Sequence, residues 1–151
     1  MTGEKRRLGS RRPAWKVDEA TSRRLARVRQ RGTSPEQQVR VLLRGMGVRV
    51  RSSKRRLPGS PDIVSIKGRW AVQVNGCFWH QHPGCARATM PKRNRSLWEQ
   101  KFAANMERDE RLAAKLREMG FRLLVVWECE VEERPARVAA RFARLIRGRA
   151  G

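Results

Sequence analysis

The first group of apolar residues along the chain recurs at intervals of three and four between residues 39 and 46, which is the spacing of a helix. Ser34 precedes this group and is expected to be the N-cap, with Gln37 as its partner in a capping box. Gly45 or Gly47 is expected to end the helix, because glycine tolerates the left-handed conformation at a helix C-terminus.

Three shorter apolar runs follow, at residues 48–50, 63–66 and 70–74. Their length and their β-branched and aromatic residues predict strands. The second and third runs flank Lys67-Gly68, which favours a tight turn, so we expect them to form a hairpin.

The second half of the chain begins with a long helical pattern, residues 96–119. Ser96 and Glu99 are expected to form its capping box, and Gly120 is expected to end it. Residues 121–127 are almost wholly apolar, which is typical of a central strand buried on both faces.

A last helix is expected over residues 136–147, after Pro135. The resulting order is helix, three strands, helix, strand, helix. An α/β fold follows, with a mixed sheet flanked by helices and the last strand reached by a crossover.

The charge of the chain narrows the class of partner. With 36 Lys and Arg against 14 Asp and Glu, the net charge is +22 over 151 residues, which favours a polyanion such as nucleic acid. An anionic membrane surface is the alternative, but the basic residues are spread along the chain and are not concentrated in one amphipathic helix. No run approaches the length of a membrane span, and no secretory signal is present, so we expect a cytoplasmic, nucleoid-associated protein.

Residues 1–31 are basic and poor in large apolar side chains, so we expect them to form a DNA-binding arm before a single domain at residues 32–151. The alternative is a solvated tail with one short helix over residues 18–29. The length of the chain suits one domain.

The candidate metal chemistry is concentrated in a short segment. Cys77, His82 and Cys85 fall within nine positions, and Cys129 is the remaining cysteine of the chain. Four sulfur and nitrogen donors suit a closed, structural zinc site, whereas a lone cysteine is more often only part of a core. His80 is left over, and its imidazole is suited to act as a general base.

Asp62 lies at the start of a predicted strand, and Gln73 and Asn75 lie at the end of the next. The hairpin could bring these side chains together. A Pro-Asp pair followed by such a triplet is a weak signature of restriction-endonuclease-like nucleases, and a turn is the simpler reading. Glu36 would lie in the first turn of the first helix, where the helix dipole alone favours a carboxylate.

Taken together, these segments resemble one family, the very short patch repair DNA mismatch endonucleases. The resemblance covers residues 22–130. It rests on these runs: Thr33-Ser34-Pro35-Glu36, Pro58-Gly59-Ser60-Pro61-Asp62, Gly76-Cys77-Phe78-Trp79-His80-Gln81-His82, Trp98-Glu99-Gln100-Lys101, Asn105-Met106-Glu107-Arg108-Asp109 and Val126-Trp127-Glu128-Cys129.

The resemblance implies a restriction-endonuclease-like, three-layer α/β/α fold with a structural zinc site. It implies a magnesium-dependent enzyme that nicks one strand 5′ to the thymine of a T:G mismatch. Asp62 and the main-chain carbonyl of Val74 match the magnesium ligands. His80 matches the general base and Glu36 an assisting acid. Asn75 stands where the best-known members have a second histidine, and an amide can donate a hydrogen bond but cannot carry a proton.

The resemblance also implies that Phe78 and Trp79 insert beside the mismatch, with Trp98 supporting them, although packing around the zinc would also explain the two aromatics. Leu25 falls where the family places an apolar residue in the minor groove. The remaining DNA-binding candidates are Lys101 and Asn105. The zinc ligands implied by the resemblance are Cys77, His82, Cys85 and Cys129.

Three functions therefore remain open at this point: a mismatch-nicking enzyme, a nuclease of the same fold with another DNA target, and a non-catalytic, zinc-stapled DNA-binding module. For each, the expected partner is double-stranded DNA, with a mismatch in the first case. We expect a monomer with structural zinc and, for the enzymes, catalytic magnesium.

Overall fold

The computed structural model describes Ala20, Arg23 and residues 33–50 and 57–148. The expected arm, residues 1–31, lies outside this part of the chain except for those two residues, and so do Leu25 and the predicted helix at residues 18–29. None of the described helices is long and apolar enough to cross a membrane.

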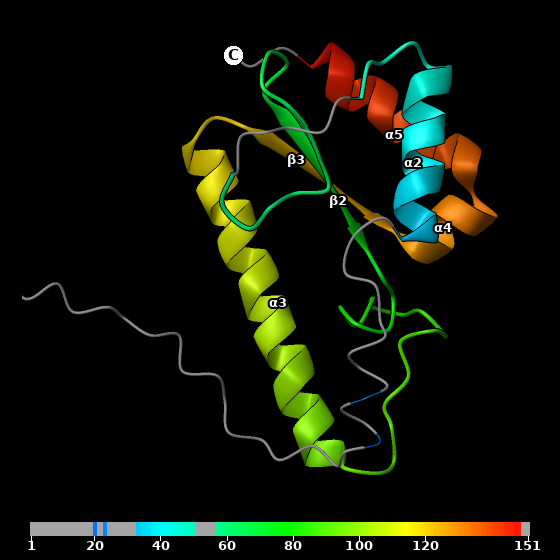
Figure 1. Ribbon diagram of the computed structural model, residues 1–151, viewed down its shortest axis with the longest axis vertical. Helices are drawn as coiled ribbons and strands as arrows, with labels where there is room; N and C mark the ends of the chain where they lie inside the picture. Colours follow the sequence, from blue (N-terminus) through cyan, green and yellow to red (C-terminus); the bar gives the residue numbers. More distant parts are fainter. Residues whose placement is uncertain (1–19, 21–22, 24–32, 51–56, 149–151) are drawn as a thin grey trace, which may run out of the picture.

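A three-stranded mixed sheet lies at the centre (Figure 1). β1 (Ile63–Ser65) pairs antiparallel with β2 (Trp70–Asn75), and β2 pairs parallel with β3 (Arg122–Trp127). Both the hairpin and the crossover to the last strand are confirmed. The register places Val72 opposite Ile63 and Asn75 beside Trp127.

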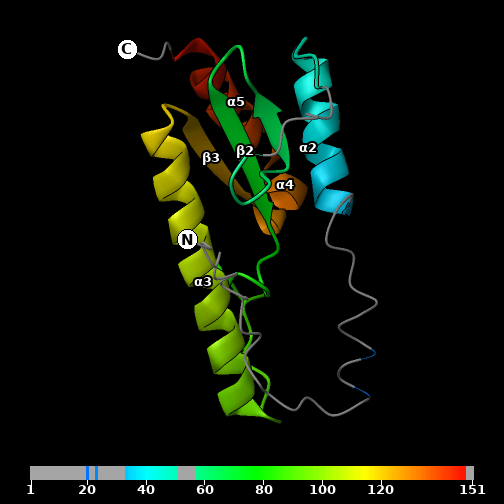
Figure 2. The same cartoon turned by 60° about the vertical axis from the view of Figure 1, so that its left-hand side comes forward.

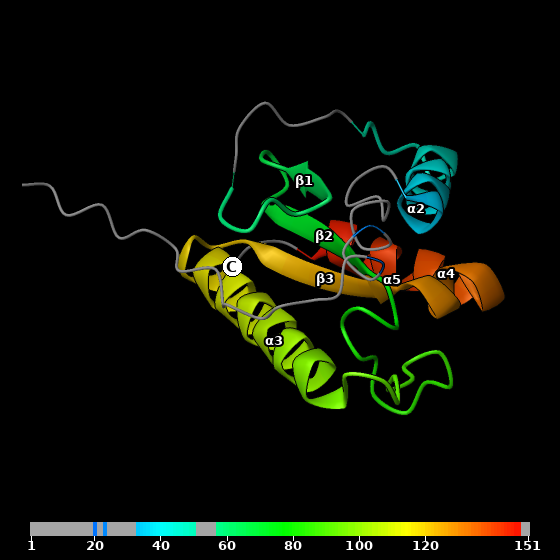
Figure 3. The same cartoon turned by 60° about the horizontal axis from the view of Figure 1, so that its bottom comes forward.

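Helices cover both faces of the sheet (Figure 2). α3 (Arg95–Glu118) covers one face, where Leu112 and Leu116 pack on Ala71. The other face carries the larger core, formed with α2 (Ser34–Gly45), α4 (Glu128–Glu133) and α5 (Pro135–Arg147). Figure 3 shows α3 apart from the other helices, with the sheet between them. The predicted mixed α/β architecture is thus confirmed.

Both predicted capping boxes are wrong. Thr33, not Ser34, is the N-cap of α2, because its backbone is extended and its hydroxyl accepts the amide of Glu36 at 3.5 Å. At α3 the N-cap is Asn94, in a left-handed conformation, and no side chain caps the helix. The glycine at position 120 does end α3, with a φ of +78°.

Two strand predictions also need correction. Residues 48–50 are not a strand, although Val48 and Val50 pack against the core. β3 lies at an edge of the described sheet, and β2 is the central strand. The apolar run in β3 reflects helices on both faces of the sheet, not a neighbour on each side.

The short helix α4 is absent from the sequence prediction. It begins at Glu128, directly after β3, and its first turn is closed by Glu130, whose carboxylate accepts from the main-chain amide of Trp127 at 3.1 Å. This turn is important because it carries Cys129 to the end of the sheet.

Candidate active site and metal centre

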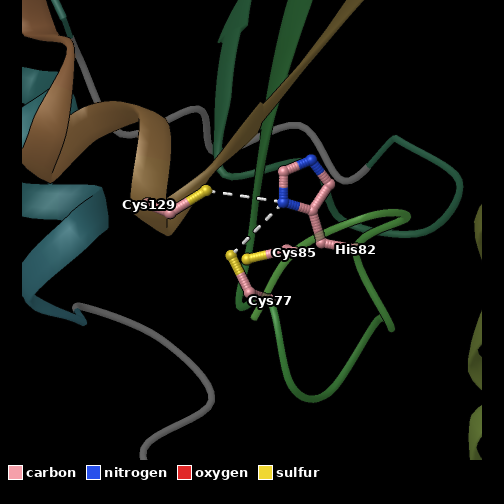
Figure 4. A group of neighbouring side chains, drawn as sticks. All are labelled: Cys77, His82, Cys85 and Cys129. Carbon is pink, nitrogen blue, oxygen red and sulfur yellow. Dashed lines mark hydrogen bonds between the residues drawn. The ribbon is translucent and has the colours of Figure 1, made fainter. Parts of the chain in front are cut away.

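Four side chains converge beyond the carboxyl end of β2 (Figure 4). The ligand atoms of Cys77, His82, Cys85 and Cys129 all lie within 4.8 Å of one another. Nδ1 of His82 lies 3.4 Å from Sγ of Cys129 and 3.6 Å from Sγ of Cys77. Bonds of about 2.3 Å to sulfur and 2.0 Å to nitrogen in a tetrahedron require separations close to these. The four residues could hold a metal ion.

The loop itself is folded by its backbone. The amide of His82 donates to the carbonyl of Cys77 at 2.9 Å, and the amide of Cys85 donates to the carbonyl of His82 at 3.2 Å. Gly84, with a φ of +71°, allows the sharp return between the last two ligands. The ring of His82 stacks on Trp127, with 4.2 Å between centroids, which orients Nδ1 toward the sulfur atoms.

Burial and hydrogen bonding shift the pKa values of the three thiols in different directions. Desolvation raises the pKa of Cys77 to about 12 and also raises the pKa of Cys129. The main-chain amide of Arg87 lowers the pKa of Cys85. Metal ligation needs thiolates, so metal binding at this cluster is expected to release protons.

Arg87 ties the metal-binding loop to α4. Its guanidinium pairs with Glu132 at 2.6 Å, Glu133 at 3.2 Å and Glu128 at 3.4 Å. Because Cys129 lies on the same short helix, these contacts help to hold the loop cysteines against it. The sequence reasoning assigned no role to this arginine.

A second cluster consists of oxygen donors. Oδ2 of Asp62 accepts the amide of Val74 at 2.7 Å, so the start of β1 is held against the end of β2. The carboxyl of Asp62 is also hydrogen-bonded to Glu36, which is 5% exposed at the start of α2. The structure thus brings together three residues that the sequence analysis proposed for one site.

Arg40 supports this carboxyl pair. It lies four residues after Glu36, on the same face of α2, and its Nη2 donates to the carbonyl of Asp62 at 2.9 Å. Desolvation and, second, the hydrogen bond with Glu36 raise the pKa of Asp62 to about 8, while the charge of Arg40 acts in the opposite direction. In the described structure without a cation, Asp62 therefore holds a proton near neutral pH.

His80 is part of a dyad that sequence reasoning missed. Its Nδ1 lies 2.5 Å from Oδ2 of Asp109 on α3. Such a carboxylate holds the proton on Nδ1 and leaves Nε2 as the acceptor. Asp109 belongs to a run that carries the family resemblance, but no feature of the sequence indicated its contact with a loop 29 residues away.

Two amide side chains of β2 have buried oxygens without a hydrogen-bond partner in the described part of the chain. They belong to Gln73 and Asn75, which follow one another on the same face of β2. Asn75 is 3% exposed and lies at the end of the strand, next to the metal-binding loop.

Aromatic side chains cover the first turns of α3. The ring of Phe78 contacts Trp79 at 5.1 Å, Phe102 at 5.2 Å and Trp98 at 5.5 Å between centroids. Phe78 and Trp79 therefore pack on α3 and on each other, and both stay partly exposed. The structure favours neither insertion into DNA nor a purely structural role.

The two remaining DNA-binding candidates adjoin this aromatic cluster. Nζ of Lys101 lies 5.2 Å from the ring of Trp79 and 5.9 Å from that of Trp98. Partial burial of the Lys101 ammonium group lowers its pKa, because desolvation disfavours the charged form. Nδ2 of Asn105 donates to the carbonyl of Trp79 at 2.9 Å, so α3 positions the aromatic loop directly.

Comparisons with known proteins identify the family of this chain. The family model described as DNA mismatch endonuclease Vsr matches residues 16–87. A type II nicking enzyme of Xanthomonas oryzae pv. oryzae is 43% identical over 109 residues, 72% of this chain and 79% of the relative. A type II nicking enzyme of Neisseria meningitidis is 38% identical over 82% of this chain and 86% of the relative.

The DNA mismatch endonuclease Vsr of Escherichia coli is 37% identical over 118 residues, which are 78% of this chain and 75% of that protein. These three relatives match 72%, 82% and 78% of this chain, which is far more than a single motif. The chain therefore belongs to the very short patch repair family of DNA mismatch endonucleases, and it is a DNA endonuclease.

Proposed function

We propose that the protein nicks one strand of duplex DNA 5′ to the thymine of a T:G mismatch, as a magnesium-dependent monomer with a restriction-endonuclease-like fold. The observation that carries this proposal is that the described residues contain two units of the kind that the reaction needs. One is the buried Asp62–Glu36 carboxyl pair held by the amide of Val74, and the other is the His80–Asp109 dyad.

The donors of the carboxyl cluster fit magnesium. They are oxygens, which Mg²⁺ prefers, and the orphaned amide oxygens beside them lack a partner that a cation or its water molecules would supply. Asp62 and the carbonyl of Val74 would hold the ion, and Glu36 would hold a water molecule on it. When bound, Mg²⁺ would stabilise the charge that develops on the scissile phosphate.

His80 is proposed to accept the proton of the attacking water. Because Asp109 accepts from Nδ1, the lone pair of Nε2 is free to take this proton, and Asp109 stabilises the imidazolium that forms. Asn75 is proposed to donate its amide hydrogens to the phosphate. It orients this group without adding charge, unlike the histidine found at this place in the best-known members.

Cys77, His82, Cys85 and Cys129 are proposed to bind a structural Zn²⁺. All four coordination positions would be filled by protein, so this ion holds the loop and leaves no place for substrate. Its role is to present His80 and the two aromatic residues from one short segment.

Phe78 and Trp79 are proposed to enter the base stack beside the mismatch, with Trp98 behind them and Lys101 and Asn105 at the edge of the pair. Unstacking costs least at a mispair, so the cluster would favour damaged sites. Leu25 and the basic arm are proposed to bind in the minor groove of the DNA. Leu25 lies outside the described residues, as does the arm except for Ala20 and Arg23.

The test is nicking of end-labelled duplexes that carry T:G, U:G or C:G at one position, with Mg²⁺. We expect cleavage of T:G to exceed that of C:G by about 100-fold or more, as a few kcal/mol of mismatch discrimination would give. Equal cleavage of all three duplexes would overturn mismatch specificity.

A nuclease with a different DNA target is the second candidate. It is favoured by Asn75, which departs from the family pattern in the site itself, and several relatives are named as type II nicking enzymes. Varying the bases on both sides of the mismatch separates the two. A preference set by flanking sequence and not by the mispair would favour this candidate.

A further inference from the structure

Gln73 carries a buried side-chain oxygen that has no hydrogen-bond partner among the described residues. Unpaired buried acceptors destabilise a fold and are rare in native proteins, so each one calls for an absent partner. The ligands proposed above for magnesium are Asp62 and the carbonyl of Val74, and Gln73 is not among them. It lies in β2, between Ala71, which packs under α3, and Asn75.

The strand register places Gln73 beside the carboxyl cluster. Ile63 lies opposite Val72 in the antiparallel pair, and the same register continued by one residue puts Gln73 opposite Asp62. Directly opposite residues of an antiparallel pair have their side chains on one face, with Cβ atoms about 5 Å apart. The carboxylate of Asp62 is held beside this part of β2, because it accepts the main-chain amide of Val74, the residue after Gln73.

We propose that Gln73 supplies a side-chain oxygen to the divalent cation bound by Asp62. This inference rests on the proposed function, because it adds a ligand to the magnesium site proposed there. An amide oxygen is a hard, neutral donor that suits Mg²⁺. Neutrality is an advantage here, since the Asp62 and Glu36 carboxyls already share a hydrogen bond and a third carboxylate would add like-charge repulsion.

The experiment measures Mn²⁺ binding to the full-length, zinc-loaded protein without DNA, from the electron paramagnetic resonance signal of free Mn²⁺. Gln73→Met keeps the length of the side chain and removes its oxygen. We expect about tenfold weaker Mn²⁺ binding, as for the loss of one supporting ligand. Without Mn²⁺, the Tm of the zinc-loaded variant is expected to equal or exceed that of the wild type, because an apolar group replaces an unpaired polar one.

Gln73→Glu provides the opposite change. It should bind Mn²⁺ more tightly than the wild type and lower the Tm of the metal-free protein, because the new carboxylate repels its neighbours until a cation arrives. Gln38→Met is the matched control. Gln38 bonds to Ser34 on the outer part of α2, away from the sheet, so neither quantity should change.

Mn²⁺ affinity of Gln73→Met within twofold of wild type would overturn the inference, as would a lower Tm with unchanged affinity, which indicates a structural role. Asp62→Asn separates this failure from failure of the proposed function. If wild type binds Mn²⁺ and Asp62→Asn does not, the cation site stands and Gln73 alone is in question. If Asp62→Asn binds as wild type does, the proposed site and the inference both fail.

Discussion

The two candidate metal clusters of this protein are built in opposite ways. The Cys/His cluster takes three donors from one short loop and one from the first turn of α4, and its four ligand atoms already have the spacing that a tetrahedral ion needs. The carboxyl cluster takes Glu36 from α2 and Asp62 from the start of β1, and it has oxygen donors. The first cluster offers the four donors of a closed tetrahedral site, whereas the second offers fewer protein donors than the six positions of Mg²⁺.

This difference indicates which cluster serves folding and which serves chemistry. A closed set of soft ligands couples metal binding to the folding of a loop. A buried carboxyl pair that lacks a cation is unfavourable in the folded protein and becomes favourable only when the cation binds. We therefore expect a metal ion at the Cys/His cluster to stabilise the fold, and the carboxyl cluster to destabilise it until a cation binds.

Loss of the Cys/His cluster should have the largest effect. Cys129→Ser removes the proposed ligand that joins the loop to α4, and structural zinc sites can contribute on the order of 10 kcal/mol to folding. We expect loss of bound zinc, a large fall in Tm and loss of nicking, measured by metal analysis, calorimetry and plasmid relaxation. Chelated wild type should recover with zinc, whereas the variant should not. Full zinc content and an unchanged Tm would show that Cys129 is not a ligand.

Changes at the dyad should affect the reaction and spare the fold. His80→Asn is expected to slow single-turnover nicking by about 10²- to 10⁴-fold, the range for loss of a general base. Asp109→Asn should slow it less, by about tenfold or more, because the imidazole remains but loses its orienting acceptor. Both variants should bind duplex DNA as wild type does.

Glu107→Gln is the control for the second change, because Glu107 is an exposed acid on the same helix that pairs only with Arg111 among the described residues. Nicking by Asp109→Asn at the rate of Glu107→Gln would remove Asp109 from the mechanism.

The stability of the magnesium-free protein should depend on pH through Asp62. Its pKa is raised from 3.8 to about 8 by burial and by Glu36, so the folded state holds a proton that the unfolded state has lost. Stability should therefore fall as pH rises from about 4 to about 8. Magnesium should restore more stability at pH 8 than at pH 6, because it binds the carboxylate. Tm measured against pH, with and without Mg²⁺, tests this, and an identical slope in Asp62→Asn would contradict it.

Removal of the Arg87 contacts should have the smallest effect. Arg87→Ala breaks ion pairs to three glutamates at the protein surface, and such pairs contribute little. We expect zinc to be lost to a chelator about two- to fivefold faster, with nicking unchanged. Arg137→Ala, an exposed arginine on α5, is the control. A loss of zinc as complete as in Cys129→Ser would mean that Arg87 helps to form the cluster and does not merely support it.

The predictions from sequence succeeded where the signal was local. The turn at Lys67-Gly68 produced the hairpin, and Gly120 ended α3. The N-cap of α2 was misplaced by one residue because Thr33 and Ser34 both suit that position, and only the backbone conformation separates them. α4 was missed because six residues with one buried apolar side chain, Val131, have no helical period to detect.

In the candidate site too, residues with a local sequence signal were predicted and residues that act through distant contacts were not. Cys77, His82 and Cys85 were grouped from their spacing, and Cys129 only as the remaining cysteine. Asp109 and Arg40 could not be assigned, because each acts on a residue more than 20 positions away.

The sequence by itself determined the order of most elements, the polyanionic class of partner and the family, because these depend on local spacing, total charge and short motifs. Only the tertiary structure decided that Asp109 faces His80, that Arg40 contacts Asp62, and that the buried oxygens of Gln73 and Asn75 have no hydrogen-bond partner among the described residues. The physical reason is that these contacts join separate elements, and their geometry is set by the packing of the whole sheet between its two helical layers.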